Sequence, residues 1–397
     1  MTPWLWATLL AAWLTWLVVI VFSAQLVSTH SVDFDTYYAA AQALRFDHGA
    51  DIFSVATLNQ VAQAHGLCPH VGHYLPSYVY PPLLAILLEP LTLLPCESSA
   101  ILWLLLNAAL WAGATLLLAD VLARRWPGRR LMATTLVTLI SLGCFPAYLG
   151  TFLGQVHLLI LIGLALTLWL AERRKFALAG GVLAVITVLK FFPAVVLVYY
   201  LARGRYRLVV SALLTCLGLV VFMLIGSSPA TVVGSVTTAF AFVHGLTESG
   251  GQNESLTVTI PVIGSALADV VGLAYLAVIA RRSGDDLLGV GWATCAMLLA
   301  SPLVWSFYLV WLLPALCACL ATFATSASHD WRWRGAWVAL AVIYIVVAFP
   351  LSITLRPFAT LALYVISGLL YWRSGAAPRA PAPAAELATA ASAPAGG

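Results

Sequence analysis

The stretch Glu172–Arg207 reads ERRKFALAGGVLAVITVLKFFPAVVLVYYLARGRYR, an apolar run between two basic clusters. A run of this length and composition is typical of membrane-spanning helices, which need roughly 20 mostly apolar residues. Lys190 and Pro193 interrupt it, and proline neither continues a helix nor favours helix in the preceding residue. Because basic loops stay on the cytoplasmic side, we expect two short helices that enter the membrane, meet near Phe192 and return.

The rest of the chain has the same character. Only 9% of its 397 residues are charged, against about a quarter in soluble domains, and apolar runs recur from Trp4–Val27 to Pro357–Trp372. The first run is too long for a signal-peptide core and lacks a basic n-region, so we expect it to be retained as a helix. Closed barrels show short alternating segments instead. The predicted fold class is an all-α polytopic membrane protein with about 10 to 12 transmembrane helices.

Lysine and arginine gather between the apolar runs, which orients the chain. The clusters are Arg124, Arg125, Arg129 and Arg130; Arg173, Arg174 and Lys175; Arg203, Arg205 and Arg207; Arg281 and Arg282; Arg332 and Arg334; and Arg373. By the positive-inside rule these loops are cytoplasmic, which makes 28–81 and 228–256 outer loops. Residues 1–374 then form one membrane domain, and the Ala/Pro-rich tail 375–397 is predicted to be disordered in the cytoplasm. Within Leu83–Ala123, a break at LLPCESS predicts a short or re-entrant first piece.

Several classes of partner lack support in the sequence. There is no Walker loop, no dinucleotide fingerprint and no basic patch with interleaved aromatic residues, so nucleotides and nucleic acids are not expected. The seven cysteines are scattered without a Cys-x-x-Cys pair, which indicates neither a disulfide framework nor a zinc site. Cys68 with His65, His70 and His73 is the only metal-like cluster, and scattered loop residues are its commoner explanation. We expect no metal and no cofactor.

Two carboxylates follow the first apolar run, in SVDFDTYYAA (Ser31–Ala40). On a helix, residues two apart point about 200° apart, so Asp33 and Asp35 cannot both face one site. The residues that follow, to Phe53, have helical spacing that indicates an amphipathic helix on the surface at the membrane edge. A purely structural interpretation makes Asp33 an N-cap, worth about 1 kcal/mol, and Asp35 a solvated neighbour.

Further motifs follow in order along the chain. They are YVYPPLLAILLEPLTLLP (Tyr78–Pro95), FLGQVHLLILIGLAL (Phe152–Leu166), the broken run Ala179–Arg207, GGQNESLT (Gly250–Thr257) and SPLVWSFYLVWLLPAL (Ser301–Leu316). Together with Asp-Phe-x-x-Tyr-Tyr-x-Ala-Ala from Asp33, this ordered set resembles glycosyltransferase family 87, membrane mannosyltransferases of GT-C type that use polyprenyl-phosphate-mannose. Each motif alone is weak, and their order carries the resemblance.

The resemblance implies a GT-C bundle whose first outer loop carries a catalytic carboxylate, here Asp33, with Asp35 as a secondary candidate. It implies inverting transfer of a hexosyl group, mannosyl in that family, from a polyprenyl-phosphate donor to a glycolipid or polysaccharide acceptor. The donor would enter from the membrane lipids and the acceptor from outside. High alanine, leucine and arginine usage favours a GC-rich bacterial source, so the predicted location is the bacterial plasma membrane, with the active site facing the periplasm or exterior.

Candidate binding residues follow from position and chemistry. Lys190 lies within an apolar stretch, where burying a charge costs free energy. A charged residue at such a position usually has a function, so Lys190 is a candidate ligand of the donor phosphate. Arg356, at the start of an outer helix, is a second one, with a boundary anchor as its alternative. Candidates for substrate binding are Tyr37, Tyr80, Gln155, His157, Gln252, Asn253 and Trp305. Capping and turn formation are the structural alternatives for Tyr80, Gln155, His157, Gln252 and Asn253.

The chain departs from the family at one position. Members often carry histidine directly after the tryptophan of the Ser-Pro-x-x-Trp motif, whereas here Trp305 is followed by Ser306. If that histidine holds the donor phosphate or the acceptor in the family, this chain must bind that group in another way, and His244 and His157 are the candidates.

Two other functions remain open from the sequence. A secondary transporter or lipid flippase could use Lys190 and the broken helix as a gate, and a non-catalytic scaffold would use Asp33 only as a cap. A transporter concentrates polar residues near the membrane midplane, whereas here they lie in outer loops beside the membrane. This distribution favours chemistry at the membrane surface.

Overall fold

The computed structural model describes residues 32–65, 75–126, 128–248, 253–255, 285–301, 303–325, 331–349 and 354–376. Within these ranges the chain forms fifteen α-helices, two short 3-10 helices and no strand. The elements are α2 (Val32–Phe46), α3 (Val55–His65), α4 (Pro82–Leu88), η1 (Glu89–Leu93), α5 (Cys96–Arg125), α6 (Arg130–Leu142), α7 (Phe145–Leu153), α8 (His157–Glu172), α9 (Phe176–Leu189), α10 (Ala194–Ala202), α11 (Tyr206–Gly226), α12 (Pro229–Glu248), α15 (Asp286–Leu299), η2 (Ser306–Leu312), α16 (Leu313–Thr325), α17 (Trp331–Ala348) and α18 (Arg356–Ala376). The predicted helix Trp4–Val27 and the predicted disordered tail beyond Ala376 lie outside the described residues.

Several helices are apolar and long enough to cross a membrane. They are Cys96–Arg125, Tyr206–Gly226 and Ser306–Phe323, and the pair α6 and α7, bent by 53°, would make a fourth. Five further apolar helices in the described part are shorter, at 10–17 residues. The protein is therefore an all-α polytopic membrane protein, as predicted. The count of about 10 to 12 spans stays a prediction, because 1–31 and 256–284 lie outside the described residues.

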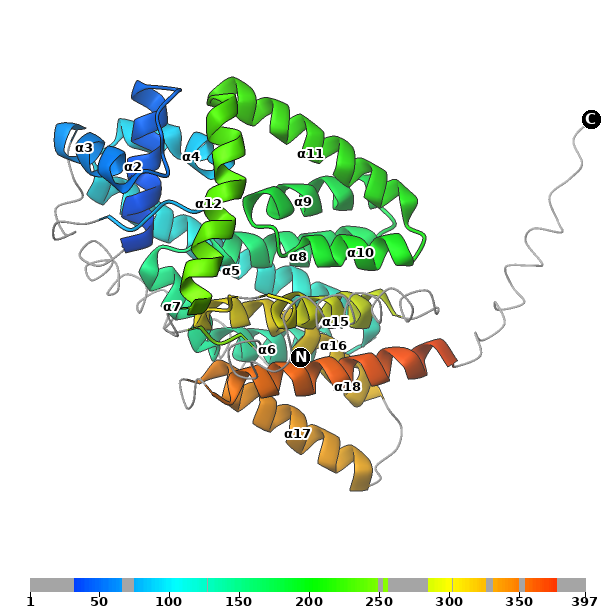
Figure 1. The fold of residues 1–397 in the computed structure, drawn as a ribbon. Helices are drawn as coiled ribbons and strands as arrows, with labels where there is room; N and C mark the ends of the chain where they lie inside the picture. The colour runs from blue at the N-terminus through cyan, green and yellow to red at the C-terminus, as the bar shows by residue number, and fades with distance from the viewer. Residues whose placement is uncertain are drawn as a thin grey trace, which may run out of the picture.

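The two predicted helix breaks are present. Helix α9 ends at Leu189, Lys190 is extended (φ −156°, ψ 121°), and α10 begins after Pro193. Likewise α4 and η1 are separated from α5 around Pro95. Helix α9 packs against α8 and α11, and α9 and α10 both lie below α11 in Figure 1. Both breaks follow from proline, which cannot donate to the helical ladder.

Helices α2, α3 and α4 gather at one end of the bundle (Figure 1). The helix predicted to follow Asp33 forms, but it ends at Phe46 rather than near Phe53. The prediction of an exposed face is also wrong, because every residue from Phe34 to Leu44 is buried. Helix α2 packs against α3, α4, η1, α5 and α7. Alanines at 39, 40, 41 and 43 have side chains small enough for neighbours to approach closely. The segment is a buried part of the bundle rather than a helix lying on its surface.

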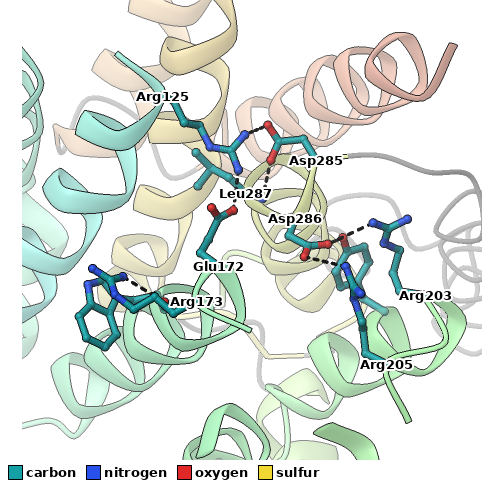
Figure 2. Close-up of polar contacts among 10 residues, drawn as sticks. Arg125, Glu172, Arg173, Arg203, Arg205, Asp285, Asp286 and Leu287 are labelled. Atoms are coloured by element: carbon teal, nitrogen blue, oxygen red, sulfur yellow. Dashed lines mark hydrogen bonds and ion pairs between the residues drawn. The ribbon is translucent and has the colours of Figure 1, made fainter. Parts of the chain in front are cut away.

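A network of ion pairs joins several helix ends near Glu172, the C-terminal end of α8, as Figure 2 shows. Arg125 of α5 pairs with Glu172 at 2.5 Å and with Asp285. Asp286 of α15 pairs with Arg203 at 3.3 Å and with Arg205 at 3.4 Å. Two of the basic clusters predicted to share one side of the membrane, those of Arg125 and of Arg203 with Arg205, therefore contribute to one end of the bundle.

Candidate active site

A cavity of about 300 Å³ opens beside the start of α2. Its wall comes from α2, the segment 76–80, the end of α7 with the following turn, and residues 305–308. Five of the residues singled out from the sequence line it, namely Asp33, Tyr37, Tyr80, Gln155 and Trp305. Segments more than 250 residues apart in the chain, around Asp33 and Trp305, thus meet in one cavity.

Gln155 is the centre of the hydrogen bonds in this cavity. Its Oε1 accepts from the Tyr37 hydroxyl at 3.2 Å and the Tyr80 hydroxyl at 2.9 Å. Its side chain also hydrogen-bonds Asp33 in a way that favours the carboxylate, which requires the amide nitrogen as donor. One amide therefore fixes two tyrosines and the candidate base.

The turn before Gln155 depends on glycine. Gly154 ends α7 with φ of +78°, in the left-handed region that glycine adopts without strain. A Cβ at this position would lie 2.7 Å from the Cβ of Phe34 in α2. Trp103 donates to the Gly154 carbonyl at 2.7 Å. Gly154 therefore lets the α7–α8 turn approach α2 closely enough for Gln155 to reach Asp33.

Asp33 lies inside the first turn of α2 and faces the cavity. Burial raises the pKa of its carboxyl to about 6, while the Gln155 hydrogen bond and the charge of Lys190 act in the opposite direction. A carboxylate with a pKa in this range is ionised at neutral pH yet basic enough to accept a proton. This is the chemistry that a general base requires.

Asp35 does not line the cavity, in agreement with the expected divergence of the two carboxylates. Its side chain is buried, and Cys96 Sγ lies 3.9 Å from its Oδ1. Burial, and then the neighbouring charge of Asp33, raise the pKa of Asp35 to about 7. Cys96 is disulfide-bonded, although the scattered cysteines indicated no disulfide framework.

Lys190 sits directly behind the cavity wall. Its Nζ donates to the Tyr80 hydroxyl at 3.3 Å and lies 3.9 Å from the centroid of the Tyr308 ring. The rings of Trp311 and Phe192 also lie within 6.0 Å of the ammonium. Aromatic faces stabilise a desolvated cation. The helix break therefore places a positive charge next to the cavity, with no ion pair to a carboxylate in the part of the chain that the structure describes.

His157 and Asn253 lie outside the cavity wall. The His157 ring is buried, its Nε2 is 3.1 Å from the Ala147 carbonyl, and it packs where Gly150 has no side chain. The Asn253 Oδ1 accepts from the backbone of Ser255 and Val304, both at 3.0 Å. The Asn253 contacts match its structural interpretation as a turn residue, whereas His157 contacts α7 and does not cap α8. Gln252, and the side chain of His244, lie outside the described part of the chain.

Arg356 is 2% exposed and does not face the cavity. Its Nη1 donates to Glu254 at 2.6 Å and to the Ser306 hydroxyl at 2.7 Å. The guanidinium is therefore occupied by protein groups in this arrangement. Arg356 lies away from the cavity in this structure. Its direct contact with a donor phosphate stays a prediction.

Sequence reasoning missed Tyr308, whose ring lies under Lys190. Tyr308 belongs to the motif Ser301–Leu316, but nothing local distinguished it from neighbouring apolar residues. Ser306, noted from the sequence only as a departure from the family's histidine, lines the cavity, and Glu254, weighed with Gln252 and Asn253 as a candidate for hydroxyl binding or capping, binds Ser306 from behind. Among the described residues, no group of three His, Cys, Asp or Glu side chains is arranged to hold a metal ion.

Comparison with known proteins adds independent information. The model of glycosyltransferase family 87 matches residues 78–311. A relative from Mycobacterium tuberculosis (strain CDC 1551 / Oshkosh), a polyprenol-phosphate-mannose-dependent alpha-(1-2)-phosphatidylinositol pentamannoside mannosyltransferase, is 25% identical over 310 residues. The alignment covers 71% of this chain and 64% of that relative, so the chain spans less than two thirds of its length. No solved structure matches.

Proposed function

The chain belongs to glycosyltransferase family 87, and from this premise we propose that it transfers a mannosyl group from a polyprenyl-phosphate donor to a hydroxyl of a glycolipid or polysaccharide acceptor. The observation that carries the proposal is the cavity in which Asp33, Gln155, Tyr37 and Tyr80 meet, with Lys190 directly behind it. The relative's dependence on polyprenol-phosphate-mannose supports the choice of donor. A transporter with a gate at Lys190 is less well supported, because the family match points to glycosyl transfer.

The proposed reaction is a single displacement. A sugar hydroxyl is a poor nucleophile, so Asp33 accepts its proton as the oxygen attacks the anomeric carbon. The new carbon–oxygen bond forms as the bond from that carbon to the phosphate oxygen breaks, and polyprenyl phosphate leaves with the electron pair. Because attack and departure occur on opposite faces, the configuration inverts. The hydrogen bond from Gln155 orients the carboxylate.

Lys190 is the candidate for stabilising the leaving group. The departing phosphate gains negative charge, which a nearby cation offsets most effectively where water is scarce. The Lys190 ammonium reaches the cavity wall through Tyr80 and lies over Tyr308. Both rings line the cavity, so a small movement of the lysine side chain would bring it to a bound phosphate.

The position of the cavity supports an orientation. Helix α8 starts next to Gln155 and ends at Glu172 in the network of basic residues, a distance of about 24 Å for its length. If the basic end faces the cytoplasm, the cavity faces the opposite side. We place the site at the outer surface of a bacterial plasma membrane, next to the lipids that hold the donor.

The experiment is mannosyl transfer in membranes that contain the protein. Radiolabelled polyprenyl-phosphate-mannose and GDP-mannose are supplied in parallel, with membranes lacking the protein as the control and with endogenous polyprenyl-phosphate-mannose synthesis inhibited. We expect label to reach the acceptor fraction only from the lipid-linked donor. Transfer from GDP-mannose under these conditions, or from neither donor, would contradict the proposal.

A further inference from the structure

Ser306 is held by two buried charged groups of opposite sign. Its hydroxyl donates to the Glu254 carboxylate, and it accepts from Arg356 Nη1 at 2.7 Å. Glu254 and Arg356 are 3% and 2% exposed, and pair with each other at 2.6 Å. A buried ion pair of this kind is costly to form and is stable only with good geometry and further hydrogen bonds. The Ser306 hydroxyl supplies one such bond to each partner.

The backbone fixes the register of this arrangement. The Glu254 amide donates to the Val304 carbonyl at 2.7 Å, and the Val304 amide donates to Asn253 Oδ1 at 3.0 Å. Segments 253–255 and 303–306 therefore lie side by side, with Glu254 directly behind Ser306. Arg356 closes the cluster from the start of α18 and also donates to the Phe349 carbonyl at 3.3 Å.

These contacts limit the kind of hydrogen bond that Ser306 can form with a molecule in the cavity that it lines. A serine hydroxyl has one donor hydrogen and two acceptor lone pairs. The hydrogen is committed to Glu254 and one lone pair to Arg356. The remaining lone pair can only accept a hydrogen bond, so Ser306 suits a hydroxyl group and not an unprotonated phosphate oxygen.

The rings on either side of Ser306 favour the same kind of ligand. Trp305 and Phe307 both line the cavity, with ring centroids 6.3 Å apart and planes within 8° of each other. An aromatic face suits the apolar C–H face of a sugar ring, and a fixed polar atom on the same cavity wall can orient a hydroxyl. The same cavity wall thus carries Tyr80 and Tyr308, which the cation Lys190 contacts, and Ser306, which presents an acceptor atom.

We propose that Ser306 is a sugar-hydroxyl subsite, in which the buried Glu254–Arg356 pair holds the serine as a hydrogen-bond acceptor between Trp305 and Phe307. The proposal rests on the proposed function. It adds that Ser306 and its neighbours recognise carbohydrate rather than phosphate. Ser306 would contact the substrate, and Glu254 and Arg356 would act through it as positioning residues.

The test measures recognition separately from catalysis. Binding of methyl α-mannoside and its monodeoxy derivatives to the full-length protein in nanodiscs is measured by saturation-transfer NMR titration, for the parent, Ser306→Ala and Ser306→Thr. We expect the parent to bind one deoxy derivative about 2- to 10-fold more weakly than the intact sugar, the effect of one neutral hydrogen bond. Ser306→Ala should lose that preference, and Ser306→Thr should keep it because the hydroxyl remains.

Two further variants serve as a control and as a test of the positioning residues. Ser77→Ala removes another serine hydroxyl from the same cavity wall and should leave the preference unchanged. Glu254→Gln can donate to Ser306, so that the serine hydrogen turns toward the cavity, and should weaken the preference although Ser306 is still present. If Glu254→Gln does not fold, Ser306→Ala and Ser306→Thr still decide the question.

The outcomes separate this inference from the proposed function. A preference that depends on Ser306, in a protein that transfers no mannose, would support the subsite and contradict the proposed reaction. Transfer by the parent, with equal binding of all deoxy derivatives or a preference that survives Ser306→Ala, would overturn the subsite alone. Absence of any sugar binding would also overturn it. Repeating the titration with monodeoxy forms of a short-chain polyprenyl-phosphate-mannose shows whether the hydroxyl belongs to the donor or to the acceptor.

Discussion

At the scale of single residues, two neighbouring carboxylates have different surroundings although they lie two positions apart. Asp33 faces the cavity and accepts from Gln155, whereas Asp35 points into the protein next to Cys96. Helical geometry requires this divergence. It assigns chemistry to Asp33 and leaves Asp35 as a buried group whose effect should appear in stability.

Asp35 should make the protein less stable as pH rises. Its folded pKa is about 7, above the roughly 3.9 of an unfolded chain, so the folded state holds a proton that the unfolded state releases. The stabilising effect is complete below the unfolded value and is lost as pH rises to about 7. Asp35→Asn should therefore reduce the fall in melting temperature between about pH 4 and pH 7, the range that these two pKa values bracket. The same fall in parent and variant would show that Asp35 does not titrate in this way.

At the scale of elements, the site depends on how closely the α7–α8 turn approaches α2. Gly154 permits that approach because it has no side chain and adopts a positive φ. The sequence motif around Gln155 contains this glycine, but only the fold shows which helix it meets.

Gly154→Ala should both destabilise the protein and lower its transfer activity. The added methyl group meets Phe34 and must adopt φ of +78°, which alone costs about 1 kcal/mol. Gly128 has the same φ but nothing within 4 Å of an added Cβ, so Gly128→Ala is the matched control. We expect a larger drop in melting temperature for Gly154→Ala, and loss of transfer only there. Equal effects of the two substitutions would mean that the contact with Phe34 is unimportant.

The extent to which sequence predicts these elements depends on how local their causes are. The break at Lys190 was predictable because Pro193 acts on its own neighbours. The burial of α2 was not, since an alanine-rich helix fits a buried position and a surface position equally well. The pairing of Glu254 with Arg356 joins residues 102 positions apart, and neither residue carries a local sign of the other. Asp33 and Gln155 were each candidates from the sequence, but nothing in the sequence showed that they lie together.

At the scale of the whole molecule, α8 separates two polar regions of different kinds. Its N-terminal end adjoins the cavity, and its C-terminal end joins the ion pairs shown in Figure 2. Asp285 caps α15 by accepting from the Leu287 amide at 2.8 Å and also pairs with Arg125. This network is expected to hold helix ends together rather than to act on substrate.

Asp285→Ala should lower stability without changing substrate binding. It removes an N-cap and one partner of a partly buried ion pair, together worth roughly 2 to 4 kcal/mol. Arg124→Ala is the control, because the Arg124 side chain is 51% exposed in its pair with Asp120 and such pairs contribute at most about 1 kcal/mol. Melting temperatures and the KM for donor are measured on both. A changed KM in Asp285→Ala would show that the network influences the distant cavity.

The most direct test of the central claim compares Asp33→Asn with Asp35→Asn in mannosyl transfer from polyprenyl-phosphate-mannose, at matched expression and with folding checked by melting temperature. Asparagine preserves size but cannot accept the proton, so we expect Asp33→Asn to lose about 100-fold or more of the rate and Asp35→Asn to stay within a few-fold of the parent. The parental rate should also rise with pH through about 6 and then level off, because Asp33 must be ionised. Full activity in Asp33→Asn would contradict its assignment as the base.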